Sequence, residues 1–236
     1  MKVFQKMLVV ALVVVVFGGI FYFAAKPVAQ TPRVDTFTTE KNQTDYMTMD
    51  LSYPESAAIN YPELFAYVQK SKQDFLDDFN SLTPTDIQTM HLGGDRKYNF
   101  TLTTNVATST KTVTYIVEVY TFTGGAHGGT SVATFTYDAG GKLVTLQDVF
   151  MAPYLQKVSD LAHNYFYATI DPGYLQPDSV NAGTAPTAEN YSAWYLTDKN
   201  IVFIFGQYQV GPYVLGIQEF PLSKQSIADI LSPKFK

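Results

Sequence analysis

Two neighbouring stretches rich in threonine, valine and aromatic residues constrain the fold of this chain more than any other feature. KYNFTLTTNVATS (residues 97–109) and KTVTYIVEVYTFT (residues 111–123) are separated by a single residue. β-Branched and aromatic residues favour strands, and two such runs with a short connection predict a β-hairpin. The segments 130–138 and 142–146, joined by an Ala-Gly-Gly turn, continue the pattern. The chain is therefore expected to contain an antiparallel meander.

Apolar residues with a helical period interrupt these strands at two places. Between residues 61 and 82, and again between 155 and 166, they recur every three or four positions, which predicts two longer amphipathic helices. Ser223 is a candidate N-cap for a short C-terminal helix. The helices do not alternate regularly with strands, so the predicted fold class is α+β with a mainly antiparallel sheet. Further strands are predicted at 46–54, 192–211 and 214–222.

An apolar segment near the N-terminus divides the chain. Residues 7–25 carry no charge and have about the length that spans a bilayer. Two lysines precede the segment, which predicts that residues 1–6 stay cytoplasmic and that the bulk of the chain is extracytoplasmic. An uncleaved signal-anchor, giving a single-pass membrane protein, is favoured over a cleaved signal peptide, because the apolar run is long and Pro27 stands in the candidate cleavage site. We expect a polar tether at 26–44 and a folded domain at 45–236.

Composition excludes several classes of function. The chain has no cysteine, which rules out disulfides, thiolate metal sites and cysteine nucleophiles. It has 16 Lys and Arg against 21 Asp and Glu, and no basic cluster, so nucleic-acid binding is not expected. The three histidines, His91, His127 and His163, lack the spacing of metal ligands. We expect no metal and no cofactor.

Residues 171–192 form the longest stretch without a periodic pattern. The stretch contains three prolines and two glycines. A long irregular segment inside a compact domain is typical of a functional or mobile loop. A disordered insertion is the equally weighted alternative.

The motif GGAHGG (residues 124–129) places His127 among four glycines at a predicted hairpin connection. Glycine permits positive φ angles and close approach of backbones. One interpretation is that Gly125 and His127 contact a ligand, or that the imidazole acts as an acid or base. The other is that the imidazole fixes its own turn by hydrogen bonds to local carbonyls. Catalysis would need a partner nucleophile or carboxylate, and no neighbour in sequence supplies one. A turn role is favoured first, ligand contact second and catalysis last.

A second motif, FGQYQVGPYVLG (residues 205–216), contains Tyr208 and Tyr213 on either side of a Gly-Pro corner. Exposed tyrosines on a rigid corner suit stacking on sugars or anchoring a protein partner. Packing at the edge of the core is the alternative for either tyrosine. Both tyrosines are candidate ligand-binding residues.

Taken together, these motifs resemble a known extracytoplasmic domain family. YTFTGGAHGGT, FTYD and GKLVTLQDVF, followed by a helix and then YLTDKNIVFIFGQYQVGPYVLG, are similar to the domain shared by the anti-sigma factor RsiV and the N-terminal module of the peptidoglycan deacetylase PdaC. MDLSYPE and FLDDFN resemble the smaller module that precedes it in the family. The resemblance divides the domain into 45–95, the smaller leading module, and 96–236, the module with the GGAHG motif.

The resemblance implies a module of the cell envelope that binds rather than catalyses. In RsiV the domain senses lysozyme, and in PdaC it accompanies a separate deacetylase domain. Only six residues precede the apolar segment and the sequence stops at Lys236, so we expect neither sigma-factor binding nor deacetylation. The expected partner is a cell-wall glycan or a wall-active protein such as lysozyme, bound at Gly125, His127, Tyr208 and Tyr213. The alternatives are a structural envelope protein without a small ligand and, less favoured, a wall hydrolase.

Overall fold

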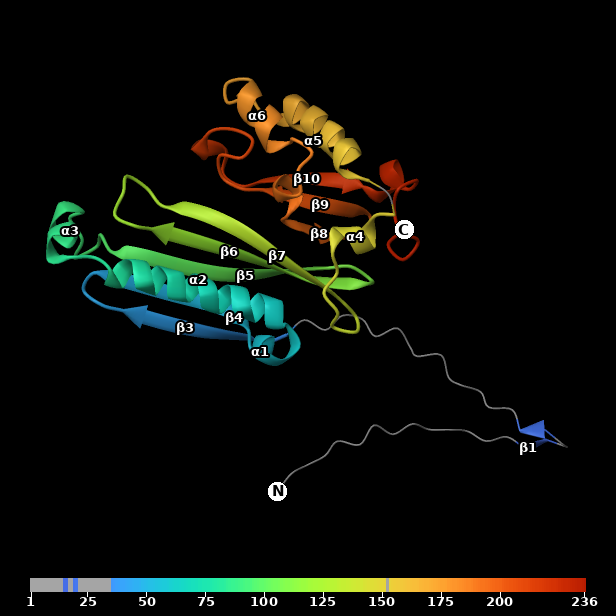
Figure 1. Cartoon of the computed structure of the whole chain (residues 1–236), viewed down its shortest axis with the longest axis horizontal. Coiled ribbons are helices and arrows are strands. Elements are labelled where there is room, and N and C mark those ends of the chain that lie inside the picture. The colour runs from blue at the N-terminus through green and yellow to red at the C-terminus, as the bar shows by residue number, and fades with distance from the viewer. Residues whose placement is uncertain (1–14, 17–18, 21–34, 152) are drawn as a thin grey trace. The chain divides into compact units, whose positions relative to one another are not determined.

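The computed structural model describes residues 15–16, 19–20, 35–151 and 153–236 (Figure 1). β1 (Val15–Val16) and β2 (Gly19–Ile20) pair antiparallel with each other. The rest of the predicted span 7–25, and all of the predicted cytoplasmic segment 1–6, lie outside the described residues. Within the described part of the chain, no helix is both long enough and apolar enough to cross a membrane. The signal-anchor therefore stays a prediction.

The first half of the folded domain is a five-stranded sheet with the strand order β3-β4-β5-β6-β7. All neighbouring strands are antiparallel except β4 and β5, which are parallel. A parallel pair needs a long crossover connection, and three helices between β4 and β5 provide it. The predicted hairpin at 97–123 and the mainly antiparallel sheet are confirmed. The elements are β3 (Phe37–Gln43), β4 (Met47–Pro54), α1 (Ala57–Asn60), α2 (Pro62–Asn80), α3 (Pro84–Thr89), β5 (Tyr98–Thr108), β6 (Thr112–Phe122) and β7 (Gly129–Asp138).

Two predicted boundaries differ from the structure. The segment 26–44, predicted to be a tether, contains β3 from Phe37 to Gln43, which pairs along its whole length with β4. The predicted division at residue 95 falls inside the five-stranded sheet, because β4 before it pairs with β5 after it. The division between the two sheets instead follows β7, since the first core extends to Tyr137 and the second begins at Val144.

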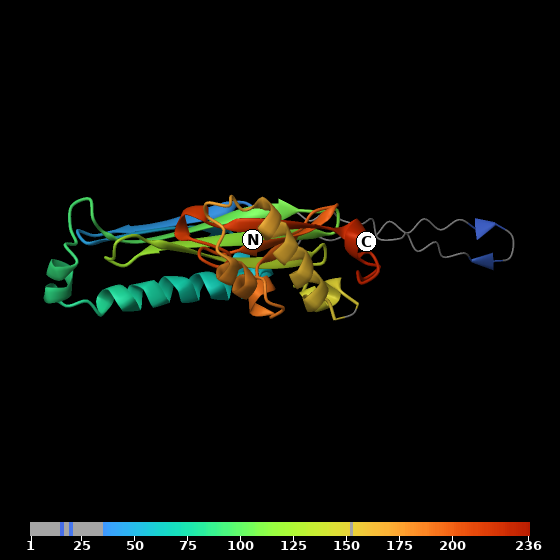
Figure 2. The ribbon, with the colours of Figure 1, turned by 90° about the horizontal axis from the view of Figure 1, so that it is seen from above.

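Helix α2 covers one face of the five-stranded sheet (Figures 1 and 2). Strand β4 alternates between buried Met47, Met49 and Leu51 and partly exposed polar residues, as expected for a strand with one face on a core. Helix α2 presents Leu64 and Phe75 to this core, and its first residue is the Pro62 that the sequence places in the first turn. The predicted helix at 61–82 is confirmed.

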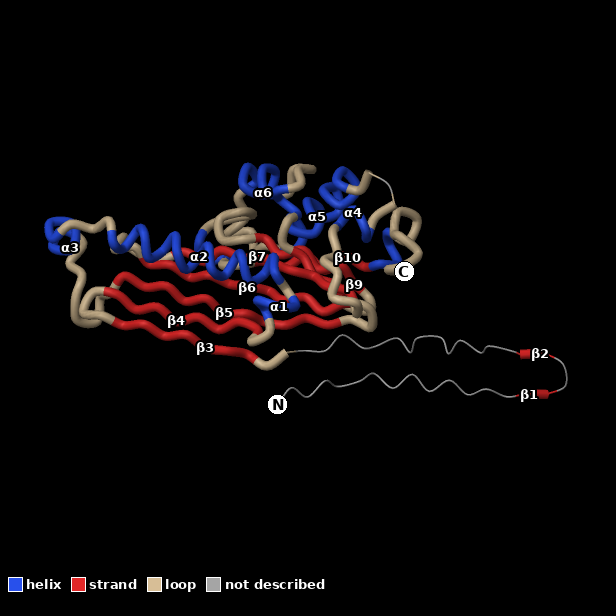
Figure 3. The backbone as a smooth tube through the Cα atoms, turned by 60° about the horizontal axis from the view of Figure 1, so that its bottom comes forward, coloured by secondary structure: helices blue, strands red, loops and turns tan. Residues whose placement is uncertain are grey.

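The second half of the domain has its own core between a three-stranded antiparallel sheet, ordered β10-β9-β8, and the longer of its helices, α5 (Figure 3). The apolar residues Val158, Ala162 and Phe166 of α5 are buried in this core, so the second predicted helix is confirmed. The elements are α4 (Leu146–Val149), α5 (Leu155–Thr169), α6 (Pro177–Gly183), the 3₁₀ helix η1 (Glu189–Tyr191), β8 (Trp194–Leu196), β9 (Asn200–Phe205), the 3₁₀ helix η2 (Tyr213–Leu215) and β10 (Gln218–Ser223).

One prediction for the second half is wrong, and another is confirmed in part. Residues 171–192 are neither a structureless loop nor a disordered insertion, because α6 and η1 form there and bury Val180 and Tyr191. The phenol of Tyr191 also donates a hydrogen bond to the buried Thr184 carbonyl (2.7 Å). The predicted short C-terminal helix is present as the 3₁₀ helix η3 (Lys224–Ile227). Ser223, the last residue of β10, stands at its N-cap position as predicted, but its side chain makes no capping hydrogen bond.

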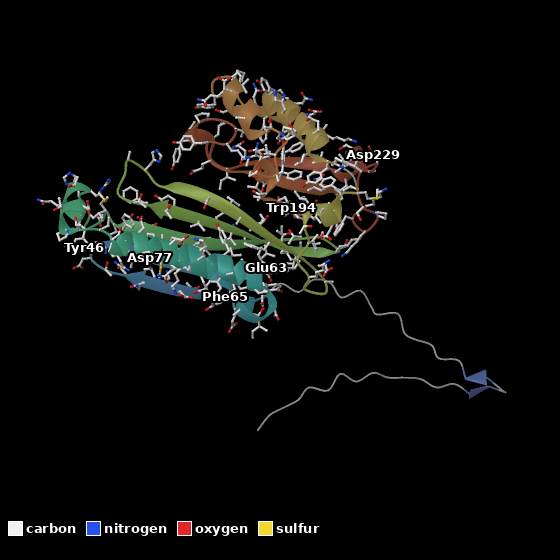
Figure 4. All side chains as sticks on the ribbon, in the orientation of Figure 1. Tyr46, Glu63, Phe65, Asp77, Trp194 and Asp229 are labelled. Atoms are coloured by element: carbon white, nitrogen blue, oxygen red, sulfur yellow. The ribbon has the colours of Figure 1, made fainter. Side chains whose placement is uncertain are left out.

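The second sheet packs on one end of the face of the first sheet that lies opposite α2. Thr112, Thr114 and Thr136 of β6 and β7 are buried there, and the hydroxyls of Thr114 and Thr136 lie 2.9 Å apart. The backbone N–H of Trp194, labelled in Figure 4, donates to the Thr134 hydroxyl (2.9 Å). No helix or sheet of the described residues covers the other end of this face, and we call it the open face. Its side chains include Gln43 of the edge strand β3 and, on the central strands, Thr48, Asn99, Tyr120 and Phe122.

Glu40 of β3 ties the edge strand to α2. Lys72 of α2 and the Tyr53 phenol both donate hydrogen bonds to its carboxylate, and these contacts lower the pKa of Glu40 below its ordinary value of 4.5. A carboxyl with a lowered folded-state pKa contributes stability that is present above the unfolded pKa and lost as pH falls through the folded pKa. We therefore expect a Glu40→Gln variant to lose less unfolding free energy than the wild type between about pH 5 and pH 3. Urea unfolding at a series of pH values measures this, and parallel curves for the two proteins would contradict it.

Candidate functional site

The GGAHGG turn connects β6 to β7, and two of its four glycines are required by geometry. Gly124 has φ +83°, and a Cβ atom there would lie 2.7 Å from the Met90 sulfur. A Cβ atom on Gly128 would lie 2.4 Å from the Tyr120 ring, so this ring packs directly on the backbone of the turn. Gly125 has no such constraint, because the nearest atom to its Cβ position is 4.0 Å away.

Arg96 also holds the GGAHGG turn in place. Its Nη2 donates to the carbonyls of Gly124 and Gly125 (both 2.8 Å), and its Nε donates to the Met90 carbonyl (3.0 Å). The guanidinium also lies 4.9 Å from the centre of the Phe122 ring, within cation–π range. Arg96 is not among the site residues predicted from the sequence. Its partners are backbone carbonyls six, 28 and 29 positions away, and no pattern of side chains marks such contacts.

His127 meets the two predicted tyrosines. Its ring packs on Tyr213 with centroids 4.3 Å apart, and Tyr208 lies 5.6 Å from Tyr213. The Nδ1 of His127 donates to the Gly128 carbonyl (2.9 Å), which leaves Nε2 as the atom nearest the Tyr208 hydroxyl, at 3.5 Å. The Tyr213 hydroxyl donates to the same Gly128 carbonyl (3.2 Å). The fold thus brings together residues 127, 208 and 213, which we call the histidine–tyrosine wall.

Tyr208 is strained and exposed. Its φ of +65° is in the left-handed region that non-glycine residues rarely adopt, and 56% of the residue is exposed. Its neighbours anchor the loop on both sides: Gln207 Oε1 accepts from the Thr130 N–H (2.7 Å), and Gln209 Nε2 donates to the Gly183 carbonyl (3.1 Å). Strain at an exposed residue held by such anchors is typical of a functional site.

A cleft of about 780 Å³ lies beside the wall and is floored by the open face. Gln43, Thr48, Asn99 and Phe122 are directly paired neighbours on four adjacent strands, so their side chains form one row across the sheet. Asn99 Nδ2 donates to the Thr48 hydroxyl (2.6 Å), which orients both groups in the row. His127 and Tyr213 stand at the end of this row and form part of the cleft lining.

Three charged residues border the cleft at the turn before β5: Asp95, Arg96 and Lys97. Lys97 Nζ donates to the Thr44 carbonyl (2.7 Å), which keeps its cationic group at the cleft. A second, smaller hollow of about 360 Å³ lies on the other side of the turn, where Gln207, Tyr208 and Ser131 contribute to its lining. His127 and Gly128 line both hollows, so they form the ridge between them.

The chemistry that this arrangement offers is stacking and hydrogen bonding. The ring nitrogens of His127 are near a carbonyl and a phenol, and neither group is a strong base or an activated nucleophile. Across the residues that the structure describes, no three His, Cys, Asp or Glu side chains gather as they would around a metal ion. Of the other two histidines, His163 lies on α5 and His91 lies just after α3.

Comparison with known proteins matches the two halves of the domain to two families. Residues 40–130 match a family described as deacetylase PdaC, and residues 147–225 match a family described as a protein of unknown function, DUF3298. His127 lies in the first matched segment, and Tyr208 and Tyr213 lie in the second. The histidine–tyrosine wall is therefore built from residues of both matched segments. The resemblance to the DUF3298/PdaC-like domain family is confirmed.

A curated relative and two crystal structures are similar to this chain. The peptidoglycan-N-acetylmuramic acid deacetylase PdaC of Bacillus subtilis (strain 168) is 32% identical over 130 residues, which cover 53% of this chain and 27% of that protein, in its N-terminal module. Two DUF3298 family structures, from Bacteroides fragilis NCTC 9343 and Pseudomonas aeruginosa PAO1, are each 17% identical with TM-scores of 0.60 and 0.51. They cover 87% and 88% of this chain and 96% of each structure, which shows a shared fold.

Proposed function

We propose that this chain, a PdaC-like segment joined to a DUF3298 domain, is a membrane-anchored extracytoplasmic module that binds a cell-wall glycan without chemically changing it. The observation that carries the proposal is the histidine–tyrosine wall at the end of a polar row of side chains. His127 and Tyr213 provide flat ring surfaces, and Asn99 and Thr48 provide donors and acceptors below them.

This combination matches the surface chemistry of a sugar. The C–H face of a pyranose ring is apolar and packs on aromatic rings, whereas its hydroxyls need polar partners when they leave water. Amide side chains both donate and accept, so a row that contains Gln43 and Asn99 can pair with hydroxyls in several orientations. The volume of about 780 Å³ is within the range of small-ligand sites and leaves room for more than one sugar ring.

Two further considerations support an envelope ligand. The uncharged segment 7–25 favours export of the domain across the membrane. The curated relative is, by its name, an enzyme that acts on peptidoglycan, and the segment that matches the PdaC family, residues 40–130, contains strands β4, β5 and β6 and His127. A module that binds the polymer is a reasonable companion to an enzyme that modifies it.

A cationic wall-active protein such as lysozyme is the second candidate. The observation that favours it is the formal charge of −5, which would attract a basic partner at low ionic strength. Such an interaction should weaken steeply with added salt. Sugar stacking and hydrogen bonding should depend on salt much less.

The experiment is a calorimetric titration of the full-length chain with solubilised peptidoglycan fragments and, separately, with hen lysozyme. We expect saturable binding of the fragments that persists at about 0.5 M salt, where the screening length is only a few ångströms. We also expect the fragments to be recovered unchanged after prolonged incubation. Salt-sensitive binding of lysozyme alone would favour the second candidate, and cleaved or deacetylated fragments would contradict a binding module.

A further inference from the structure

The cleft carries a positive charge on an acidic chain. Across the whole sequence 21 acidic residues outnumber 16 basic ones, yet Arg96 and Lys97 face a single carboxylate, Asp95, among the residues that line the cleft. Both cations are held by carbonyl oxygens, which satisfy their hydrogen bonds but leave their charge in place. A cationic ligand group would be repelled here, whereas a neutral or anionic group would not.

The row across the open face adds a requirement on hydrogen bonding. Gln43 and Asn99 supply amide donors and acceptors on either side of the Thr48 hydroxyl, at successive positions of the pairing register. The next member of the row is the apolar ring of Phe122, and Ala126 also lines the cleft. Asn99 and the neighbouring Phe122 ring place an amide side chain beside an apolar surface, about one strand spacing apart. This pair complements a group that has an N–H, a carbonyl and a methyl.

We propose that the cleft selects sugars that bear an acetamido group over the same sugars bearing a primary amine. This inference rests on the proposed glycan-binding function and names the chemical class of its ligand. An acetamido group is neutral, pairs with amide side chains, and places its methyl on the Phe122 and Ala126 surface. Deacetylation replaces it with an ammonium, which loses the carbonyl and the methyl and gains a charge of the same sign as Arg96 and Lys97.

Deacetylation should lower the affinity of the cleft for the sugar in two ways: it removes the carbonyl and the methyl, and it adds a positive charge. A site built to hydrogen-bond a group rejects an analogue that lacks it, because the polar partners in the site are left unpaired. The like charges of the ammonium and Lys97 add a repulsion that salt can screen. The selectivity should therefore have one component that is independent of salt and one that falls as salt is added.

The test compares two tetrasaccharides of the same linkage, one of N-acetylglucosamine and one of glucosamine. They are titrated into the full-length chain at about pH 6, where an amine is protonated. We expect the acetylated tetramer to bind at least roughly tenfold more tightly. A Lys97→Gln variant should narrow this ratio by about threefold, the size of one exposed charge interaction. Lys70→Gln, which removes an exposed lysine of α2 far from the cleft lining, is the matched control and should leave the ratio unchanged.

The outcomes separate the two proposals. Equal affinity for the two tetramers, or tighter binding of the glucosamine tetramer, overturns the acetamido inference and leaves glycan binding in place. Binding of neither tetramer overturns both. A ratio that changes equally in the Lys97 and Lys70 variants would also overturn the inference, because the charge at the cleft would then have no special role.

Discussion

Replacing Gly183 with alanine is expected to lower the unfolding free energy by about 3 kcal/mol, the scale of severe overpacking. Gly183 is the buried last residue of α6, and a Cβ atom there would lie 1.9 Å from the carbonyl oxygen of Gln209. The backbone of Gln209 cannot retreat easily, because its side chain donates to the Gly183 carbonyl and accepts from the Gly206 N–H. The loop that carries Tyr208 would have to move away from α6.

Gly125→Ala is the matched control for this change. Gly125 lies in the GGAHGG turn but lines neither hollow, and the nearest atom to its Cβ position is 4.0 Å away. We therefore expect the unfolding free energy of Gly125→Ala to stay within about 0.5 kcal/mol of the wild type. Chemical unfolding of the three proteins measures the difference. If Gly183→Ala were as stable as Gly125→Ala, α6 could not pack as closely on the backbone of Gln209 as the structure shows. A Gly183→Ala protein that still folds should also bind glycan more weakly.

Tyr208 lines the smaller hollow and not the cleft, but its ring lies beside that of Tyr213, which does line the cleft (centroids 5.6 Å apart). Because Tyr208 supports the Tyr213 ring, Tyr208→Gly is expected to reduce glycan affinity about tenfold while leaving stability unchanged or higher by up to about 1 kcal/mol. The side chain is mostly exposed, so its removal costs little packing. Glycine adopts the φ of +65° without strain, which offsets the greater entropy of its unfolded chain. If Tyr208 served only to pack the loop, its replacement would lower both the stability and the glycan affinity. A lower affinity without a lower stability therefore identifies a binding role.

Tyr208→Phe isolates the hydroxyl from the ring. Its contact with His127 Nε2 is long, at 3.5 Å, so we expect this variant to keep most of the affinity. Calorimetric titration with peptidoglycan fragments and urea unfolding provide the two readouts for both variants. Full affinity in Tyr208→Gly would remove Tyr208 from the site. A loss of stability in that variant would show that its conformation is not strained.

The parts of the fold that could be predicted are those whose residues follow a local period. The hairpin of β5 and β6 and the two longer helices bury one side of a regular pattern, and that pattern is visible in the sequence. Strand β3 was missed because it is an edge strand, exposed over most of its length, and its polar residues need no alternation. The parallel pairing of β4 and β5 was missed because pairing partners 51 positions apart, such as Met47 and Tyr98, leave no local trace.

The residues of the candidate site also fall into those with a local sequence signal and those without one. Glycines around a histidine and tyrosines around a Gly-Pro corner are local signals, and residues 127, 208 and 213 do meet. The Arg96 contacts and the row across the open face depend on strand register and on backbone atoms, so side-chain identities alone could not predict them. The terminal helix is only one 3₁₀ turn long for a related reason. Buried Ile227 and the bridge between Leu231 and Phe150 hold the chain against the second core.

The most direct test of glycan binding at the wall uses the three histidines as internal probes. Their ring resonances are followed by NMR while the full-length chain is titrated with solubilised N-acetylated peptidoglycan fragments. The ring resonances of His127 should shift in proportion to the fraction of protein bound, because its ring is part of the wall. The ring resonances of His163 on α5 should stay unchanged. Saturable binding that leaves His127 unmoved, or that shifts His163 in its place, would contradict the account.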